Sequence, residues 1–267
     1  MSLPKPILLV GAGALGSSVL KGFRIAGHAT PADLIIVDLK PGDEPKAWAA
    51  DGARLNPPPE TWSEAKTVLL AVKPQGWHAV AAILRGNLAS DAVIISVMAG
   101  VQTEALKVAF AGHPVARVMP TTGVATGKGI ASIYSDAQPA LEAAQGLFGP
   151  MASTVVLGEE GQMDSATAVS GSGPAYVYAF LRALERAGRE TGLSRSHARE
   201  LARGTLVSAA RLLDSTGEEP DDLIRKVASP GGTTEAALEV LCKPGEGLDE
   251  LIMAAVHAAQ KRSKELG

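Results

Sequence analysis

Short apolar runs alternate with amphipathic segments through the first half of the chain. Helical patterns cover residues 15–26 and 102–110. The apolar runs between them cover residues 7–10, 34–37, 68–72, 93–96 and 114–118. Strands that are apolar at every position are typical of a parallel sheet with helices on both faces. The pattern therefore predicts a doubly wound α/β sheet at the N-terminus.

The character of the chain changes near Gly158. Two weaker apolar runs, 130–134 and 154–157, flank a helical stretch and are expected to complete the first domain. Beyond them the apolar positions recur at helical spacing, and Gly/Pro clusters divide the region into about five helices. We therefore predict two domains, residues 1–158 and residues 159–267.

The predicted helical domain is small for an independent core. A region of little over 100 residues, built of several short helices, buries too little apolar surface by itself. We therefore expect this domain to dimerise, so that the protein is a homodimer or a higher homo-oligomer of dimers.

Composition and charge narrow the class of protein. The formal net charge is −3, which gives no reason to bind nucleic acid. Cys242 is the only cysteine, and no apolar run approaches the roughly 18 residues of a membrane span. The N-terminus shows no secretory signal. We expect a cytoplasmic protein without a membrane partner, and the spacing of the histidines predicts no metal site.

A glycine-rich motif follows the first predicted strand and precedes a helix. Its GxGxxG spacing allows a tight turn at Gly11, approach of a pyrophosphate at Gly13, and close packing of helix and strand at Gly16. Placed between strand and helix, the motif predicts a Rossmann-type site for NADPH or NADH. The predicted cofactor-binding residues here are Gly11, Ala12, Gly13, Ala14, Leu15 and Gly16.

Two charged residues near the end of the second strand bear on the choice of coenzyme. Asp38 lies about 20 residues beyond the motif, where an acidic side chain accepts hydrogen bonds from the adenosine ribose. Such a residue favours NADH and repels a 2′-phosphate. Lys40 lies two residues further and can offset that repulsion. The sequence leaves the preference open.

The helical half contains two unusual strings, residues 164–176 and 227–241. In the first, glycines ahead of a helix are explained by close helix packing. In the second, Pro230, Gly231 and Gly232 form a turn, and Thr233 or Thr234 is a natural N-cap for the next helix. Backbone N–H groups, threonine hydroxyls and a helix dipole would converge there. The residues alone predict either a plain helix cap or a site for a small carboxylate.

Together these motifs resemble the pyrroline-5-carboxylate reductases, which complete proline synthesis by reducing a cyclic imine. The resemblance rests on GAGALG, on AVKP at 71–74, SVMAGV at 96–101 and RVMP at 117–120, and on both C-terminal strings. It implies that the substrate carboxylate is held by Ser229, Gly231, Gly232, Thr233 and Thr234. It also implies further cofactor contacts at Ala71, Val72, Lys73, Pro74, Met98, Ala99 and Gly100.

The resemblance implies hydride transfer to the C=N carbon, which makes the chain an oxidoreductase. A protonated imine is already electrophilic, so the protein mainly positions it. Thr234 is the candidate catalytic side chain near the reacting nitrogen. One departure is that the family usually continues Met-Pro with Asn-Thr-Pro, whereas Thr121, Thr122 and Gly123 follow here.

Three other functions stay open. One is the reduction of a different imine. A β-hydroxyacid dehydrogenase would share the architecture but needs a lysine base in the helical half. The candidates, Lys226 and Lys243, lie in no distinctive string. A dinucleotide-sensing regulator would bind coenzyme without turnover.

Overall fold

The computed structural model describes residues 3–266, and the chain divides into two compact units. The first comprises Met1–Gly171 with Ala259–Gly267, and the second comprises Ser172–Ala258. The predicted domain boundary at residues 158/159 lies earlier than this division. It stays a prediction.

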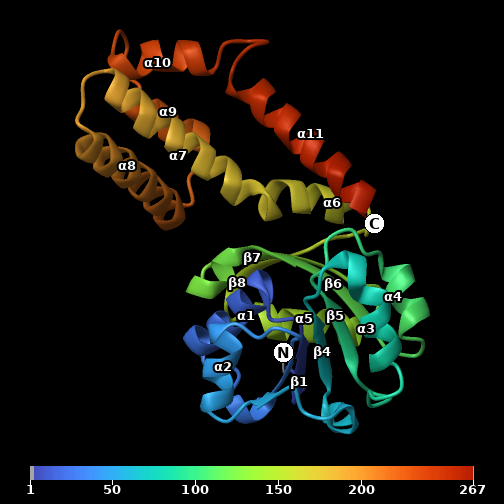
Figure 1. Ribbon diagram of the computed structural model, residues 1–267. Helices are drawn as coiled ribbons and strands as arrows, with labels where there is room; N and C mark the ends of the chain where they lie inside the picture. Colours follow the sequence, from blue (N-terminus) through green and yellow to red (C-terminus); the bar gives the residue numbers. More distant parts are fainter. Residues whose placement is uncertain (1–2, 267) are drawn as a thin grey trace. The chain divides into compact units, whose positions relative to one another are not determined.

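The first unit is built on one eight-stranded sheet with the order β3-β2-β1-β4-β5-β6-β7-β8 (Figure 1). The first six strands are parallel, as predicted, and the fold class is confirmed. The strands are β1 (Ile7–Val10), β2 (Leu34–Val37), β3 (Arg54–Leu55), β4 (Thr67–Leu70), β5 (Val93–Ser96), β6 (Val115–Pro120), β7 (Gly129–Tyr134) and β8 (Ala152–Val156).

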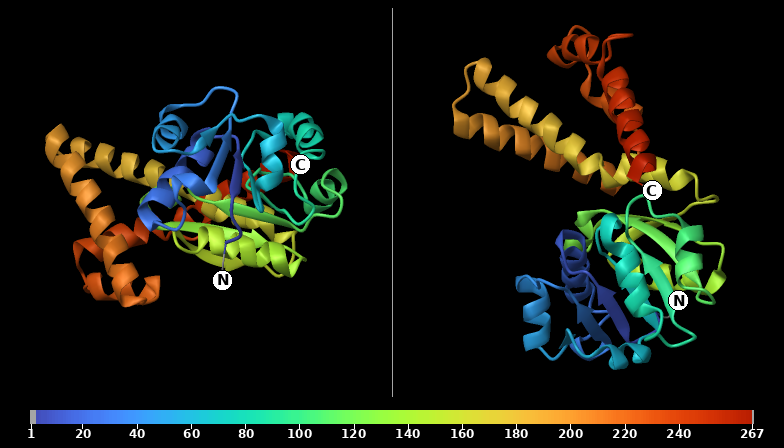
Figure 2. Two further views of the ribbon diagram at one scale, coloured as in Figure 1. Left: turned by 90° about the horizontal axis from the view of Figure 1, so that it is seen from below. Right: turned by 45° about the vertical axis from the view of Figure 1, so that its right-hand side comes forward.

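Helices cover both faces of the sheet because each central strand is apolar on both sides. In β1, Ile7 and Leu9 enter one core, while Leu8 and Val10 enter another on the opposite face. Figures 1 and 2 show the helices on the two sides. The helices of this unit are α1 (Ala14–Ala26), α2 (Asp43–Ala50), α3 (Trp77–Leu84), α4 (Thr103–Ala109), α5 (Gln138–Phe148) and α6 (Gln162–Ala166).

The sheet departs from the predicted parallel pattern at β7, which runs antiparallel to β6. Parallel neighbours need a crossover of a dozen or more residues, and residues 121–128 between these strands are too few. The departure from the family motif lies in this connection. The Thr121 hydroxyl accepts a hydrogen bond from the Ile130 N–H at 3.1 Å. The hydroxyl that stands where the family has an amide therefore helps to close the β6–β7 hairpin.

The second unit is helical, as predicted. A π-helical turn, Thr167–Gly171, connects α6 to its first helix. The helices are α7 (Gly173–Glu190), α8 (Arg195–Thr216), α9 (Pro220–Val227), α10 (Thr233–Leu241) and α11 (Leu248–Leu266), the last of which ends in the first unit. There Ser263 Oγ donates to Asp164 Oδ1 of α6 at 2.6 Å.

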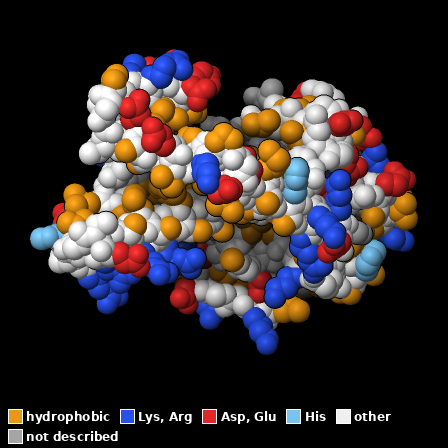
Figure 3. Space-filling model, turned by 90° about the horizontal axis from the view of Figure 1, so that it is seen from above, with side chains coloured by type: hydrophobic (Ala, Val, Ile, Leu, Met, Phe, Trp, Pro, Cys, Tyr) orange, Lys and Arg blue, Asp and Glu red, His pale blue; other side chains and the backbone are white. Residues whose placement is uncertain are grey.

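Few apolar side chains of the second unit are buried within one copy of the chain. Among residues 172–258, Ala198 and Ala202 are the only buried hydrophobic residues. Large side chains such as Phe180, Leu251 and Met253 are 45%, 66% and 58% exposed. Figure 3 shows hydrophobic side chains exposed among the charged ones. None of the helices within residues 3–266 is long and apolar enough to span a membrane.

Candidate active site

The predicted cofactor residues gather at one edge of the sheet. The glycine motif follows β1, Asp38 follows β2, Ala71 to Pro74 follow β4, and Met98 to Gly100 follow β5. These four strands are neighbours in the order β2-β1-β4-β5, so their carboxyl ends meet at the same edge. The carboxyl edge is where open α/β sheets bind ligands.

The glycine loop passes so close to β4 that side chains are excluded. Gly11 has φ +92°, and a Cβ atom there would lie 2.7 Å from the Ala71 carbonyl oxygen. A Cβ atom on Gly16 would lie 2.2 Å from the Gly11 carbonyl oxygen. Both glycines therefore allow α1 to start directly against the strand ends, as their predicted roles require.

The start of α1 is left available to an anion. Its N-cap is Gly13, with no side-chain cap and no acidic residue in the first turn. Gly13 and Ala14 are exposed and Leu15 is half-buried. Apart from its two chain neighbours, no residue lies within 4 Å of where a Gly13 Cβ would be. The first N–H groups of a helix have no partner inside it. This exposed N-terminus with a positive dipole end fits a pyrophosphate.

Asp38 is tied to the glycine loop. Its Oδ2 accepts a hydrogen bond from the Ala12 N–H at 2.6 Å, and its Oδ1 accepts one from the Lys40 N–H at 2.7 Å. The sequence did not identify Asn56 as part of this site. It accepts from the Asp38 N–H and donates to the Asp38 carbonyl oxygen, both at 2.9 Å. An asparagine just beyond a very short strand is a weak signal, because β3 itself was not predicted.

The residues after β4 and β5 contribute in different ways. Ala71, Val72 and Pro74 are half-buried and Lys73 is exposed. The backbone of Ala71 and Val72 borders the glycine loop at Gly11. Met98 is only 3% exposed and packs in the core. Its side chain is therefore not available to a ligand. Ala99 is half-buried, and Gly100 is buried with φ +77°.

In the second unit, residues 229–234 form a tight turn ahead of α10. Gly231 has φ +69°, which favours glycine. The predicted N-cap is wrong, because Gly232 is the N-cap and Thr233 is the first helical residue. The reason is that the Gly232 N–H bonds the Ser229 carbonyl oxygen at 2.9 Å, which ends the turn one residue early.

This shift frees the hydroxyls of the turn. Within residues 3–266, the structure shows no hydrogen bond from the hydroxyls of Ser229, Thr233 or Thr234 to another protein group. The first N–H groups of α10 likewise have no partner inside the helix. Ser229 and Thr233 are exposed and Thr234 is half-buried. The turn thus offers donors to a small anion.

Glu235 was not predicted as part of this turn. It lies in the first turn of α10, and its Oε2 accepts a hydrogen bond from the Gly231 N–H at 2.7 Å. The Gly231 N–H is therefore already occupied. An acidic residue three positions after an N-cap, reaching back to the backbone before it, is a recognised helix-start pattern that could have revealed Glu235.

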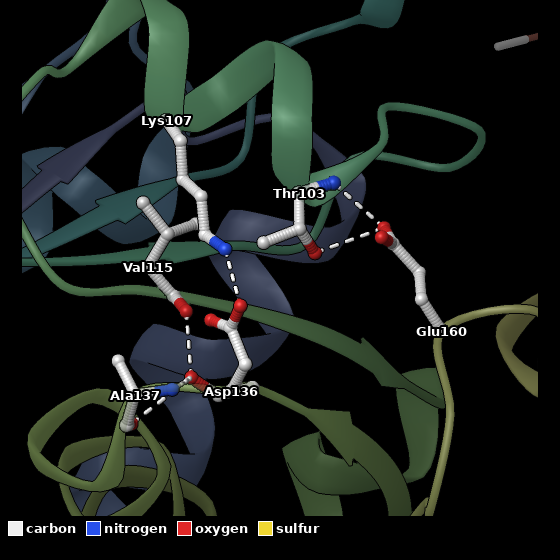
Figure 4. A network of polar contacts seen from close by, with 7 residues as sticks. Thr103, Lys107, Val115, Asp136, Ala137 and Glu160 are labelled. Atoms are coloured by element: carbon white, nitrogen blue, oxygen red, sulfur yellow. Dashed lines mark hydrogen bonds and ion pairs between the residues drawn. The ribbon is translucent and has the colours of Figure 1, made fainter.

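A second polar network holds the segment that follows β8 (Figure 4). Glu160 Oε1 accepts from the Thr103 N–H at 2.6 Å, from its hydroxyl at 2.9 Å and from Arg117 Nη1 at 2.6 Å. Burial raises the pKa of Glu160, but these hydrogen bonds outweigh burial and hold it below its ordinary value. The charged carboxylate therefore fastens this segment to β6 and to the start of α4.

The two lysines considered as a general base lie on the surface of the second unit. Lys226 forms an ion pair with Glu218, and Lys243 pairs with Glu246 at 2.7 Å. Among residues 3–266 no group of three or more His, Cys, Asp or Glu side chains could hold a metal ion.

Comparison with known families assigns each half of the chain. Residues 6–100 match the family described as NADP oxidoreductase, coenzyme F420-dependent. Residues 160–266 match the family described as pyrroline-5-carboxylate reductase dimerisation. The second match confirms the prediction that the helical region is a dimerisation region.

Full-length relatives agree with both matches. A pyrroline-5-carboxylate reductase of Pseudomonas aeruginosa is 37% identical, over 100% of this chain and 98% of the relative. Among solved structures, the Coxiella burnetii pyrroline-5-carboxylate reductase is 26% identical with a TM-score of 0.88, over 99% of both chains. The Plasmodium falciparum pyrroline carboxylate reductase with NADP bound is 25% identical with a TM-score of 0.85, over 100% of both chains. The chain therefore belongs to the pyrroline-5-carboxylate reductase family.

Proposed function

We infer that the chain reduces 1-pyrroline-5-carboxylate to L-proline with NAD(P)H, the last step of proline biosynthesis. The observation that carries this conclusion is the full-length similarity to a curated pyrroline-5-carboxylate reductase. The geometry supports this conclusion. The N-terminus of α1 in the first unit suits a pyrophosphate, and the turn before α10 in the second unit suits a carboxylate.

The first unit would hold the coenzyme. The α1 N–H groups would bind the pyrophosphate, and Asp38 lies where an acidic residue would bind the adenosine ribose in folds of this type. The backbones after β4 and β5 border the same edge of the sheet. When bound, NAD(P)H supplies the hydride for the reduction.

The second unit would hold the substrate carboxylate. We propose that Ser229 and Thr233, with the first N–H groups of α10, bind it, and that the Thr234 hydroxyl oxygen accepts a hydrogen bond from the protonated ring nitrogen. A carboxylate at a helix N-terminus is stabilised by the dipole and by the N–H donors. Because Glu235 occupies the Gly231 N–H, Gly231 shapes the turn and the other donors bind the anion.

The reduction requires few further catalytic groups from the protein. A protonated imine accepts hydride without a lysine base, and its binding in a productive orientation is the main contribution. Lys226 and Lys243 are engaged in surface ion pairs, so the structure gives no support to a β-hydroxyacid dehydrogenase.

The protein forms a homodimer through its helical region, in which large apolar side chains are exposed within one copy. We further propose that it works in the cytoplasm. Its one cysteine, Cys242, is a free, exposed thiol, as is common in a reducing compartment.

The test is an assay of NADH and NADPH oxidation with 1-pyrroline-5-carboxylate, run side by side. We expect turnover that depends on the imine, and no turnover with either coenzyme would refute the function. Thr234→Ala should lower kcat/KM for the imine about tenfold or more, whereas Thr205→Ala on exposed α8 should not. A Thr234→Ala variant within about twofold of the parent would show that Thr234 is not catalytic.

A further inference from the structure

Hydrogen bonds hold both the side chain and the backbone of Asp38 in place. Its carboxylate accepts the N–H groups of Ala12 and Lys40, at 2.6 and 2.7 Å. Its own backbone N–H and carbonyl are both bonded to the Asn56 side chain at 2.9 Å. Asn56 has φ +49°, a conformation that asparagine tolerates better than most residues. Four hydrogen bonds thus fix both the backbone and the side chain of Asp38.

The fixed carboxylate retains acceptors for a ligand. A carboxylate oxygen has two lone pairs, and each oxygen of Asp38 receives one recorded hydrogen bond. A ribose 2′-hydroxyl can donate to such an oxygen. A 2′-phosphate at neutral pH has no comparable donor and brings a charge of about −1.5 to −2. The carboxylate therefore attracts the first group and repels the second.

Arg54 and Lys40 are the cationic residues of the adjoining segments that could offset this repulsion. Arg54, on the strand next to β2, is paired with Glu64 at 2.8 Å. Lys40 is exposed, and its side chain shows no ion pair within the described residues 3–266. A lysine ammonium is a flexible, strongly hydrated point charge, unlike the rigid fork of arginine. Lys40 therefore reduces the repulsion without removing it.

We propose that Asp38 makes this protein prefer NADH over NADPH, with Lys40 limiting the size of the preference. The proposal rests on the proposed function only in that the glycine loop holds the coenzyme. The preference for NADH does not follow from similarity to relatives, because the Plasmodium falciparum structure has NADP bound.

The test measures the dissociation constants of NADH and NADPH by calorimetry on the full-length protein, without imine. We expect NADPH to bind at least about tenfold more weakly than NADH, and the ratio to shrink as salt is raised. Asp38→Asn retains an oxygen acceptor for the Ala12 N–H and removes the charge. It should tighten NADPH binding about tenfold and change NADH binding little.

Matched variants separate this effect from general charge. Asp43→Asn removes a negative charge from the first turn of α2 and should leave the ratio unchanged. Lys40→Ala should weaken NADPH binding a further few-fold. The dissociation constants of NADH and NADPH are first compared in the parent protein. The proposal can therefore be tested even if a variant does not fold.

The outcomes distinguish this proposal from the proposed function. Equal constants for the two coenzymes in the parent protein, or an unchanged ratio in Asp38→Asn, would overturn the preference alone. If the parent protein bound neither coenzyme, the proposed cofactor site and the preference would both be overturned. Tighter binding of NADH without imine turnover would support the preference and contradict the function.

Discussion

The two units differ in where their apolar side chains lie. In the first unit Phe23, Phe110 and Phe148 are at most 1% exposed, packed between helices and a sheet. In the second unit Phe180 is 45% exposed, and the buried hydrophobic residues among 172–258 are two alanines. A sheet covered on both faces forms a core within one chain. The helices of the second unit bury few apolar side chains within one copy, and residues 160–266 match a dimerisation family, in which a second copy covers such a surface.

The starts of α1 and α10 make a second comparison between the units. Each helix begins at a glycine N-cap without a side-chain cap. Yet α1 has no acidic residue in its first turn, whereas α10 has Glu235. Both starts are held by a carboxylate, but its origin differs: Glu235 comes from the first turn of α10 itself, whereas the loop before α1 is bonded by Asp38, which follows β2.

The largest expected effect comes from charging the exposed face of the second unit. In Val177→Asp/Leu251→Asp, two side chains that are 43% and 66% exposed in one copy become charged. If they lie in the dimer interface, the dissociation constant of the dimer should rise at least about 100-fold, measured by analytical ultracentrifugation.

The matched control charges the first unit instead. Ile83→Asp/Val108→Asp replaces side chains that are 55% and 69% exposed there, and should leave the dimer intact. The comparison between the units would fail if both double variants dissociated equally, or if the first remained a dimer.

A smaller effect is expected at Glu235. Glu235→Ala removes the acceptor of the Gly231 N–H and should raise KM for the imine about tenfold with little change in kcat, since the turn is less well ordered. Glu235→Gln keeps an oxygen acceptor and should restore KM. Steady-state kinetics would contradict this role if the two variants behaved alike. Glu239→Ala, on an exposed face of the same helix, is the control.

The smallest expected effect is a pH dependence of stability in the first unit. Burial lowers the pKa of His28, the nearby Lys5 charge acts in the same direction, and the hydrogen bond to the Leu147 carbonyl oxygen opposes them. The folded protein therefore binds a proton less readily than the unfolded chain. The free energy of unfolding should fall as pH drops below 6.5, the ordinary value, and should not change from this group above it.

Urea unfolding between pH 7 and pH 5 measures this effect. The slope from His28 should stay below the single-proton limit of about 1.4 kcal/mol per pH unit. His28→Gln should flatten the profile, whereas His257→Gln, at an exposed position of the second unit, should not. A His28→Gln profile that is as steep as the parent's would show that another group is responsible.

Much of the first unit could be predicted because its signals are local. Unbroken apolar runs predicted the central strands to within two residues, and the glycine spacing predicted the loop after β1. Local patterns could not predict the very short strand β3 or the antiparallel direction of β7. A two-residue strand has no pattern, and strand direction depends on the length of the connection and on partners distant in sequence.

The candidate site divides in the same way. Residue types and spacing alone indicated a dinucleotide loop, the ambiguous Asp38 and a turn at 230–232 ahead of a helix, because backbone conformation at glycines and at helix starts is determined locally. Only the tertiary structure decided that Asn56 and Ala12 hold Asp38, and that the Met98 side chain is in the core. Contacts of Asp38 with residues 18 and 26 positions away depend on which strands lie side by side, which the local sequence does not encode.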